Sequence, residues 1–323
     1  MKIVMFNLNG RGGMLHYSSQ FANDLLPKNS VWAVIPSYAE TKFYDKKVKL
    51  IKLIAPPDIK KTITETLNFK QLFDVIKQIK KINPERVYIM DNHPWYFLFG
   101  WVFRKKLWVV QHDPILHSGE AQFPLSLVIN NINIFLRKVA KKVIVHSEKF
   151  RKYLLSINTP EEKIIVQDHV SYDFFKKYGN KKLKTEKNTI LFFGRIKHYK
   201  GIQTLIDSEK YFKKLKNYKI IIAGSGDFTD FAPQVKGNKH FEIHNKFIKE
   251  EEISDFFRRS AVVVVPYYNA TQSGIIPVAY AFNKPVVATN VGGIPEMKKK
   301  GKKLVLIPPK NAKKLAEEVC KLL

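Results

Sequence analysis

The sequence contains one cysteine, Cys320, in 323 residues. A single cysteine cannot form an internal disulfide, and it has no cysteine partner for a structural zinc site. No stretch reaches the 18 consecutive apolar residues of a membrane-spanning helix, and the start MKIVMFNLNG lacks the apolar run and cleavage site of a signal peptide. These absences favour the reducing cytoplasm.

Motifs of several enzyme classes are also missing. There is no Walker loop and no Gly-x-Ser-x-Gly elbow. His112 and His117 are five residues apart, whereas a helical metal-binding pair needs a spacing of four, and no cysteine or carboxylate cluster completes a ligand set. We therefore expect no metal site and no bound cofactor.

Acidic residues are few: 28 Asp and Glu stand against 56 Lys and Arg, a formal charge of +28. Such a chain is attracted to polyanions, whether nucleic acid, anionic lipid surfaces or phosphorylated small molecules. A lysine-rich proteome or a thermophilic source explains the same composition. Because the lysines are spread along the whole chain, the charge alone does not choose among these partners.

Short apolar, β-branched runs alternate with stretches of helical spacing, which predicts parallel sheets with helices on both faces. In the first half the predicted strands are 2–8, 31–35, 48–54, 86–90, 107–111, 142–146 and 163–167. The predicted helices between them are 14–26, 65–82, 125–139 and 149–155.

The polar, lysine-rich segment 178–188 has no apolar period and is interpreted as a linker. The alternation then restarts, which predicts a second α/β domain. Its predicted strands are 189–194, 219–224, 241–244, 261–266, 285–289 and 303–307, and its predicted helices are 201–215, 250–259, 273–282 and 311–323. We place the domains at 1–175 and 176–323. Ligands of open α/β sheets bind beyond the carboxyl ends of the strands, so two facing domains would trap a ligand between them.

The turn Asn9-Gly10-Arg11-Gly12-Gly13 follows the first strand and precedes a helix. Glycine allows a phosphate to approach the backbone, and the helix start supplies N–H donors and a positive dipole end. The turn is not G-x-G-x-x-G, and no acidic residue ends the second strand, so a nicotinamide site is disfavoured. The alternatives are an anion contact at Gly12 and Gly13, or an ordinary tight turn.

A second candidate segment, Gly194 to Gly201, reads GRIKHYKG and follows the first strand of the second domain. Arg195 and Lys200 can converge across this loop on one diphosphate, the planar guanidinium and the compact ammonium neutralising a leaving nucleotide. The bland interpretation is a solvated basic loop.

Two further segments follow strands of the second domain. The first, 266–274 (PYYNATQSG), brings small polar side chains to a helix start, and the second, 284–296 (KPVVATNVGGIPE), is a buried strand followed by a glycine turn with a carboxylate.

GRIKHYKG, AGSGD at 223–227 and KPVVATNVGGIPE together resemble the retaining family-4 (group 1) glycosyltransferases, with strong cover from about residue 188 to the end and weaker cover before it. The resemblance implies the GT-B fold, two Rossmann-like domains facing a cleft. It also implies an acceptor-binding N-terminal domain, a donor-binding C-terminal domain and metal-independent transfer with retention. The Asp-x-Asp clamp of the other glycosyltransferase fold is absent.

One departure concerns two glutamates that the family carries eight residues apart. Ala270 and Val278 stand at those places, and TQSG resembles a variant of the same family. The resemblance then implies that Gln272, Ser273 and Gly274 contact the donor, with Glu296 a candidate for the ribose or a brace of its turn. Gly194 and Gly224 complete the donor-binding set.

Histidines supply the candidates in the first half. His112 and Asp113 follow a strand, and the resemblance implies that such a histidine contacts the transferred sugar, whereas a strand-end cap is the alternative. His93 begins an aromatic segment, 95–101, that suits either a core or a lipid-facing surface. His146 and His169 are interpreted as structural.

We therefore expect sugar transfer from a nucleotide-diphosphate donor, with His112, Asp113, Arg195 and Lys200 as the catalytic set. The acceptor is expected to be a glycan or a lipid-linked molecule, with the enzyme in the cytoplasm or on the inner face of an anionic membrane. A sugar-nucleotide epimerase needs a pair of carboxylates for proton abstraction, which we do not find. A nucleic-acid binder needs basic residues gathered on one face, which fits the spread of the lysines poorly.

Overall fold

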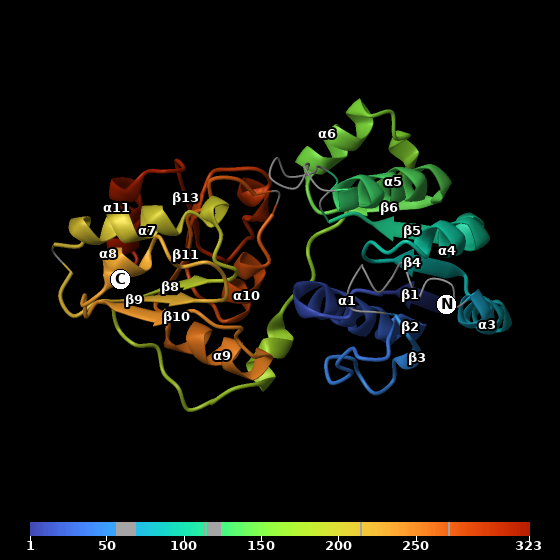
Figure 1. The fold of residues 1–323 in the computed structure, drawn as a ribbon, viewed down its shortest axis with the longest axis horizontal. Coiled ribbons are helices and arrows are strands. Elements are labelled where there is room, and N and C mark those ends of the chain that lie inside the picture. Colours follow the sequence, from blue (N-terminus) through green and yellow to red (C-terminus); the bar gives the residue numbers. More distant parts are fainter. Residues whose placement is uncertain (56–68, 113, 115–123, 214, 271) are drawn as a thin grey trace. The chain divides into compact units, whose positions relative to one another are not determined.

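The computed structural model describes residues 1–323 except 56–68, 113, 115–123, 214 and 271. The chain divides into two compact units, here called the N-terminal unit (Met1–Val170) and the C-terminal unit (Ser171–Leu323). This division falls five residues before the boundary expected from the sequence. Each unit is an α/β domain with its own sheet (Figure 1).

The N-terminal unit contains a seven-stranded parallel sheet in the order β3-β2-β1-β4-β5-β6-β7. All seven strands predicted from the sequence form, each within two residues of its expected ends. Their bounds are β1 Lys2–Phe6, β2 Ser30–Pro36, β3 Lys49–Leu53, β4 Arg86–Ile89, β5 Leu107–Val110, β6 Lys142–Val145 and β7 Ile164–Val166.

Helices connect these strands. The amphipathic α3 buries Leu72, Val75, Ile76 and Ile79, the i, i+3, i+4, i+7 stripe that a sheet-covering helix requires. The sequence did not predict α4, whose residues are apolar on nearly every side and so give no helical period. The helices are α1 Gly12–Leu25, α3 Phe69–Ile82, α4 Tyr96–Phe103, α5 Pro124–Val139 and α6 Glu148–Ser156, with 3-10 turns η1 Leu26–Lys28, η2 Arg104–Lys106 and η3 Glu161–Lys163.

The aromatic segment 95–101 divides between core and surface. Trp95, Tyr96 and Phe99 are buried, whereas Phe97 and Trp101 are exposed. The expectation of a core segment therefore holds in part, and the lipid-facing surface stays a prediction for the exposed side chains.

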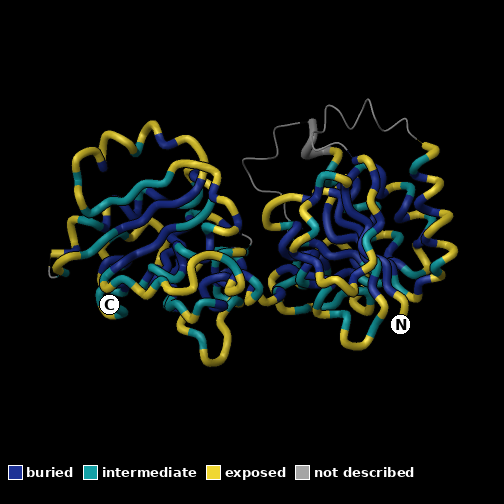
Figure 2. The backbone as a smooth tube through the Cα atoms, turned by 90° about the horizontal axis from the view of Figure 1, so that it is seen from below, coloured by how far each residue is buried: buried dark blue, intermediate teal, exposed yellow. Residues whose placement is uncertain are grey.

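The C-terminal unit contains a six-stranded parallel sheet in the order β10-β9-β8-β11-β12-β13. Its central strands are covered on both faces; β11, with sequence VVVV, is buried throughout. The strands are β8 Thr189–Phe193, β9 Lys219–Ala223, β10 Phe241–His244, β11 Val262–Val265, β12 Val286–Thr289 and β13 Leu304–Ile307, as the sequence predicted. Figure 2 shows the buried backbone in dark blue within each unit.

One predicted helix of this unit is shorter than expected. The helix proposed for 201–215 ends at Ser208 as an α-helix and continues only as a 3-10 turn, and Phe212 beyond it enters the core. The helices are α7 Ile202–Ser208, α8 Ala232–Val235, α9 Glu250–Arg259, α10 Ile275–Ala281 and α11 Ala312–Cys320, with 3-10 turns η4 Asp173–Lys177, η5 His198–Lys200, η6 Glu209–Tyr211 and η7 Ile294–Met297.

The segment 178–188, predicted as a linker, instead packs on the C-terminal unit. Arg258 donates from Nη1 to the Tyr178 carbonyl at 2.7 Å, and the Glu186 backbone N–H donates to the Arg259 carbonyl at 2.8 Å. Glu186 also pairs with the Arg259 guanidinium. The prediction was wrong because these polar contacts, unlike apolar packing, leave no periodic signal in the sequence.

Each sheet has a point where its strand order reverses, between β1 and β4 in the N-terminal unit and between β8 and β11 in the C-terminal unit. Ligands of open α/β sheets bind beyond the carboxyl ends of the strands at this switch point. The loops after β1, β4, β8 and β11 are thus the positions where a site is expected. Across the described residues, we find no helix whose length and hydropathy would let it cross a membrane.

Candidate functional site

The loops after β8 and β9 are joined by close backbone packing. Gly194 N–H donates to the Ala223 carbonyl at 2.9 Å, and Ile196 N–H donates to the Ser225 carbonyl at 2.9 Å. A Cβ on Gly224, whose φ is +148°, would stand 1.9 Å from the Gly194 carbonyl oxygen. Only glycine fits there, and the result is a loop held in one conformation.

Lys200 lies within this arrangement at the end of η5. Its Nζ stands 3.8 Å from the ring centroid of Tyr267, which follows β11 across the switch point. Arg195, on the same loop as Lys200, is exposed, and its charge acts on the Tyr267 hydroxyl. Burial is the larger effect and raises the pKa of Tyr267 to about 12. Of the two cations predicted from the sequence, Lys200 thus lies on the Tyr267 ring, and Arg195 is near enough for its charge to act on the hydroxyl.

Gly201 fixes the direction of this loop. Its φ is +69°, and a Cβ there would stand 1.8 Å from the Pro266 carbonyl oxygen. Tyr268 N–H donates to the Tyr199 carbonyl at 2.8 Å, which ties the loop after β11 to η5. The position of Lys200 is therefore set by backbone contacts between the two switch-point loops.

The predicted TQSG contacts continue the loop after β11. Ser273 is buried; its Oγ donates to Tyr267 Oη at 3.4 Å and accepts from Ile275 N–H at 3.3 Å. The Gln272 Oε1 atom is shielded from solvent and finds no hydrogen-bond partner within the described ranges. Gly274 is exposed, and a Cβ there would meet nothing within 4 Å. The open surface at Gly274 leaves its backbone accessible to a ligand.

Glu296 lies in η7, after β12, and is exposed. It follows β12, the strand next to β11, and so is not at the switch point itself. Ala270 and Val278, which stand where the resemblance would place glutamates, are both buried, as their apolar side chains require.

Sequence reasoning missed three residues of this region. Tyr267 and Tyr268 appeared only as part of a polar segment, and Lys310, beyond β13, was not considered. The Lys310 ammonium lies 5.3 Å from the Tyr268 ring centroid. A Tyr-Tyr pair directly after a buried strand was the available signal for the first two, whereas Lys310 gave none.

In the N-terminal unit, the first half of the glycine turn is anchored by side chains. The backbone N–H of Leu8 donates to Tyr96 Oη at 3.1 Å, and that of Asn9 donates to Asp91 Oδ2 at 2.5 Å. The N–H of Gly10 donates to Asn7 Oδ1 at 3.3 Å. These three donors are therefore already used within the protein.

The second half of the turn is open. Gly12 and Gly13 begin the 14-residue helix α1, whose N-cap, Arg11, makes no side-chain cap. A Cβ on either glycine would meet nothing within 4 Å. The first N–H groups of a helix have no partner within it, so this half suits an anion.

His112 belongs to a cluster that the sequence analysis did not foresee. Its ring lies 4.3 Å from Tyr17, 5.0 Å from His146 and 6.2 Å from His169, centroid to centroid. The three histidines follow the adjacent strands β5, β6 and β7. We interpreted His146 and His169 as strand ends without a role, because each alone gives no signal. Asp113 lies outside the described residues.

Burial keeps the His112 ring uncharged. Desolvation lowers the pKa of His112 well below the ordinary value, and the nearby His146 and His169 lower it further. His112 Nε2 is shielded and has no hydrogen-bond partner in the part of the chain that the structure describes. A neutral imidazole of this kind can hydrogen-bond a hydroxyl group. Within the described ranges, no three His, Cys, Asp or Glu side chains are arranged to hold a metal ion.

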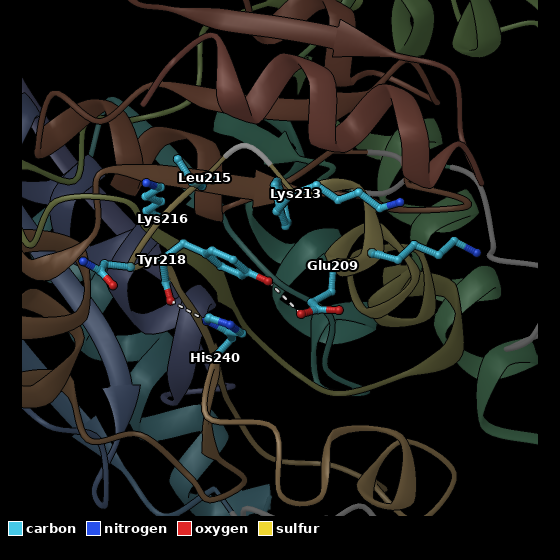
Figure 3. A pocket seen from close by; sticks show the side chains of 9 residues that line it. Glu209, Lys213, Leu215, Lys216, Tyr218 and His240 are labelled. Carbon is cyan, nitrogen blue, oxygen red and sulfur yellow. Dashed lines mark hydrogen bonds between the residues drawn. The ribbon is translucent and has the colours of Figure 1, made fainter.

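A hollow of about 480 Å³ lies elsewhere, at the amino ends of β9 and β10 (Figure 3). Tyr218 and His240 stack there at 4.0 Å, and Tyr218 Oη donates to Glu209 at 2.7 Å. Because the switch point is at the opposite, carboxyl end of the same sheet, this hollow is separate from the loops described above.

Comparison with known proteins finds a family that matches the C-terminal part of the chain. The model of the family "Glycosyl transferases group 1" matches residues 187–323. The glycosyltransferase MJ1607 of Methanocaldococcus jannaschii is 27% identical over 197 residues, covering 56% of this chain and 50% of that protein. The chain thus spans about half the length of this relative.

Solved structures match over the whole chain. Sucrose-phosphate synthase from Thermosynechococcus elongatus superposes with a TM-score of 0.71 at 17% identity, covering 100% of this chain and 89% of its own. HepE of Anabaena, in complex with UDP and glucose, gives 0.68 at 17% identity, covering 99% and 89%.

An epimerase shares the fold as well. UDP-GlcNAc 2-epimerase from Methanocaldococcus jannaschii gives a TM-score of 0.63 at 13% identity, covering 100% of this chain and 91% of its own. At these identities the structures show the fold alone, and the likeness to a family rests on the sequence match. Residues 187–323 match the group 1 glycosyltransferases, and the two α/β units have the GT-B fold of the solved glycosyltransferases.

Proposed function

We propose that this protein is a glycosyltransferase that moves a sugar from a nucleotide-diphosphate donor to an acceptor. The observation that carries the proposal is Lys200 packed on Tyr267, with Arg195 on the same loop, at the switch point of the domain that matches the family. Two cations on a loop of fixed conformation favour a diphosphate site over a solvated basic loop.

The proposed chemistry breaks the bond between the sugar carbon and the diphosphate oxygen. Arg195 and Lys200 stabilise the negative charge that builds on the departing diphosphate. In a front-face substitution with retention, the acceptor oxygen bonds to the same carbon and its proton passes to the leaving phosphate. The neutral, buried His112 is proposed to hydrogen-bond a sugar hydroxyl.

For the donor site we propose the glycines Gly194 and Gly224 as the floor, and Gln272, Ser273 and Gly274 as the contacts to the sugar nucleotide. The shielded Gln272 Oε1, which has no partner in the described residues, favours a ligand hydroxyl there. Glu296 remains a proposal for the ribose. The UDP and glucose held by HepE support a nucleotide sugar as the donor class.

For the acceptor we propose a glycan or a lipid-linked molecule at the surface of an anionic membrane. The formal charge of +28 favours such a surface. Exposed Phe97 and Trp101 on α4, with the Arg104 guanidinium 4.4 Å from the Trp101 ring centroid, are the mixture of aromatic and basic groups typical of membrane interfaces. We assign the acceptor to the N-terminal unit.

The epimerase alternative has the shared fold in its favour. It is less well supported, because the family model that matches the C-terminal domain is that of glycosyltransferases. Incubation with a UDP-sugar and no acceptor separates the two, since an epimerase converts the sugar while it stays on the nucleotide.

Substitution of one cation tests the proposal. Lys200→Ala should lower kcat/KM for sugar transfer by about a hundredfold, the usual loss for one contact to a developing charge. Lys197→Ala, on the same loop but exposed, is the matched control and should stay within about twofold. Equal activity of Lys200→Ala and wild type would contradict the proposal, as would the failure of UDP, GDP and ADP sugars to raise the melting midpoint.

A further inference from the structure

Asp91 is a buried carboxylate with no role in the chemistry proposed above. It follows β4 directly and is 8% exposed. Within the described residues it forms no ion pair with lysine or arginine. A buried carboxylate is costly without compensation, so its hydrogen bonds should indicate what it does.

Both oxygens of Asp91 are occupied. Oδ1 accepts from the hydroxyl of Tyr96, and Oδ2 accepts from the backbone N–H of Asn9 at 2.5 Å. Because the carboxylate is buried and both oxygens already accept hydrogen bonds from the protein, these contacts favour a structural role over that of a general base. The carboxylate instead connects two loops, the one after β1 and the one after β4, on either side of the switch point.

The contact to Asn9 is one of several hydrogen bonds from side chains to the backbone of the turn after β1. The Tyr96 hydroxyl that donates to Asp91 also accepts from Leu8 N–H at 3.1 Å, and the Tyr38 hydroxyl donates to the Asn9 carbonyl at 3.0 Å. Side chains therefore hold Leu8 and Asn9 in place. The turn continues directly into Gly12 and Gly13, where the open helix start lies.

We propose that Asp91, acting through Tyr96 and the Asn9 amide, is a positioning residue that aligns the start of helix α1 for the donor diphosphate. Gly12 and Gly13 have no side chains with which to fix their own conformation. The anchored half of the turn supplies the rigidity that the open half lacks. This inference rests on the proposed function, because it takes the diphosphate as the ligand of the turn.

The groups around Asp91 make the contact sensitive to pH. Burial raises the pKa of Asp91 to about 6, opposed by the hydrogen bonds from Tyr96, Asn9 and Leu8. Tyr38 and Tyr44, from the segment after β2, face it as uncharged hydroxyls, and the Arg11 guanidinium lies over the Tyr38 ring. His93, in the same turn, has its pKa lowered to about 4 by burial and stays neutral. Protonation of Asp91 removes the charge that strengthens its two bonds.

Asp91→Asn is the main test, since it removes the negative charge and leaves one acceptor oxygen for the two donors, Tyr96 Oη–H and Asn9 N–H. Binding of UDP, GDP and ADP is measured by calorimetry between pH 7.5 and 5.5. Wild-type affinity for the preferred diphosphate should fall about threefold more than that of the variant across this range, because about three quarters of Asp91 is protonated at pH 5.5. The variant should be about tenfold weaker at pH 7.5 and should show only the pH dependence that titration of the nucleotide phosphate itself causes. Asp24→Asn, which removes a carboxylate from the far end of α1, should behave as wild type.

Amide hydrogen exchange provides a readout that needs no nucleotide. Protection of the Asn9 amide should fall in Asp91→Asn, where one oxygen serves two donors, and should fall in wild type as the pH drops through about 6. Tyr96→Phe keeps the ring and removes one hydroxyl, so it tests the same network if Asp91→Asn fails to fold; it should expose the Leu8 amide and weaken binding. Unchanged protection together with an unchanged pH profile of affinity would overturn the inference. Failure of wild type to bind any nucleotide would instead overturn the proposed function, leaving hydrogen exchange to decide the role of Asp91.

Discussion

Gly224 shows at the scale of one residue how strongly the C-terminal site is constrained. A Cβ atom on Gly224 would lie 1.9 Å from the Gly194 carbonyl oxygen, so no other residue fits without a backbone shift. Gly224→Ala should therefore lower the free energy of unfolding by about 2–4 kcal/mol, because a backbone shift is the only relief. Urea denaturation of the full chain measures the change.

The matched control for this substitution is Gly237→Ala. Gly237 also has a positive φ, +76°, but a Cβ there would meet nothing within 4 Å. Its cost should be limited to the backbone conformation, about 1 kcal/mol. If both variants lose the same stability, the close packing of Gly194 and Gly224 is not what fixes the loop.

Residues differ in how well the sequence identified them. Arg195 and Lys200 could be predicted, because both lie in the motif GRIKHYKG, directly between a predicted strand and a predicted helix. Tyr267 and Asp91 were not, since each acts through a contact with a segment more than 60 residues away in the chain. A sequence without homologues gives no record of such pairs.

At the scale of elements, an ion network connects the end of α9 to the start of the C-terminal sheet. The Arg259 guanidinium donates to both oxygens of Glu242 on β10 at 2.8 Å and also contacts Glu186. The hydrogen bonds from Arg259 lower the pKa of Glu242 to about 2, with smaller contributions from His244 and Lys219. These contacts hold the segment 178–188, which the sequence predicts to be a linker, against the C-terminal unit.

Glu242→Gln should therefore lower the free energy of unfolding at pH 7 by about 1–2 kcal/mol, since the network is partly screened by solvent. A depressed carboxyl pKa stabilises the fold above the ordinary value of 4.5, and this contribution is lost as the pH falls from there towards 2. Denaturation at pH 7 and pH 3 should show the difference between variant and wild type shrinking. Glu252→Gln, which removes an exposed pair with Lys246, should change stability little at either pH.

At the scale of the whole molecule, the two units should respond differently to acid. His93 and His112 are buried as neutral rings in the N-terminal unit, with His93 lowered to a pKa of about 4 and His112 shifted well below its ordinary value. Both must gain a proton on unfolding in acid, so their burial costs nothing above pH 6.5 and destabilises the unit progressively below it. The Glu242 network of the C-terminal unit is unaffected until below pH 4.5.

Asp91 opposes this trend. Its raised pKa, about 6, means that the folded state binds its proton first, which adds stability as the pH falls from about 6 to 3.8. Because two histidines lower the stability of the N-terminal unit in acid and one carboxyl raises it, we expect the unit to lose stability overall. Hydrogen exchange between pH 7 and 5 should show the N-terminal unit losing protection before the C-terminal unit. His112→Asn should reduce that loss, whereas His198→Asn, an exposed histidine of the C-terminal unit, should not.

The two α/β units, nearly every strand and the cationic loop from Arg195 to Lys200 could be predicted from the sequence alone. Those features follow from local periodicity and from turns next to strands, which are properties of neighbouring residues. Three features could not be predicted in this way: His112, His146 and His169 gather around Tyr17, Asp91 holds the turn after β1, and 178–188 packs on the C-terminal unit. These depend on the order of strands in the sheets, and strand order brings together residues whose separation in the chain carries no local pattern.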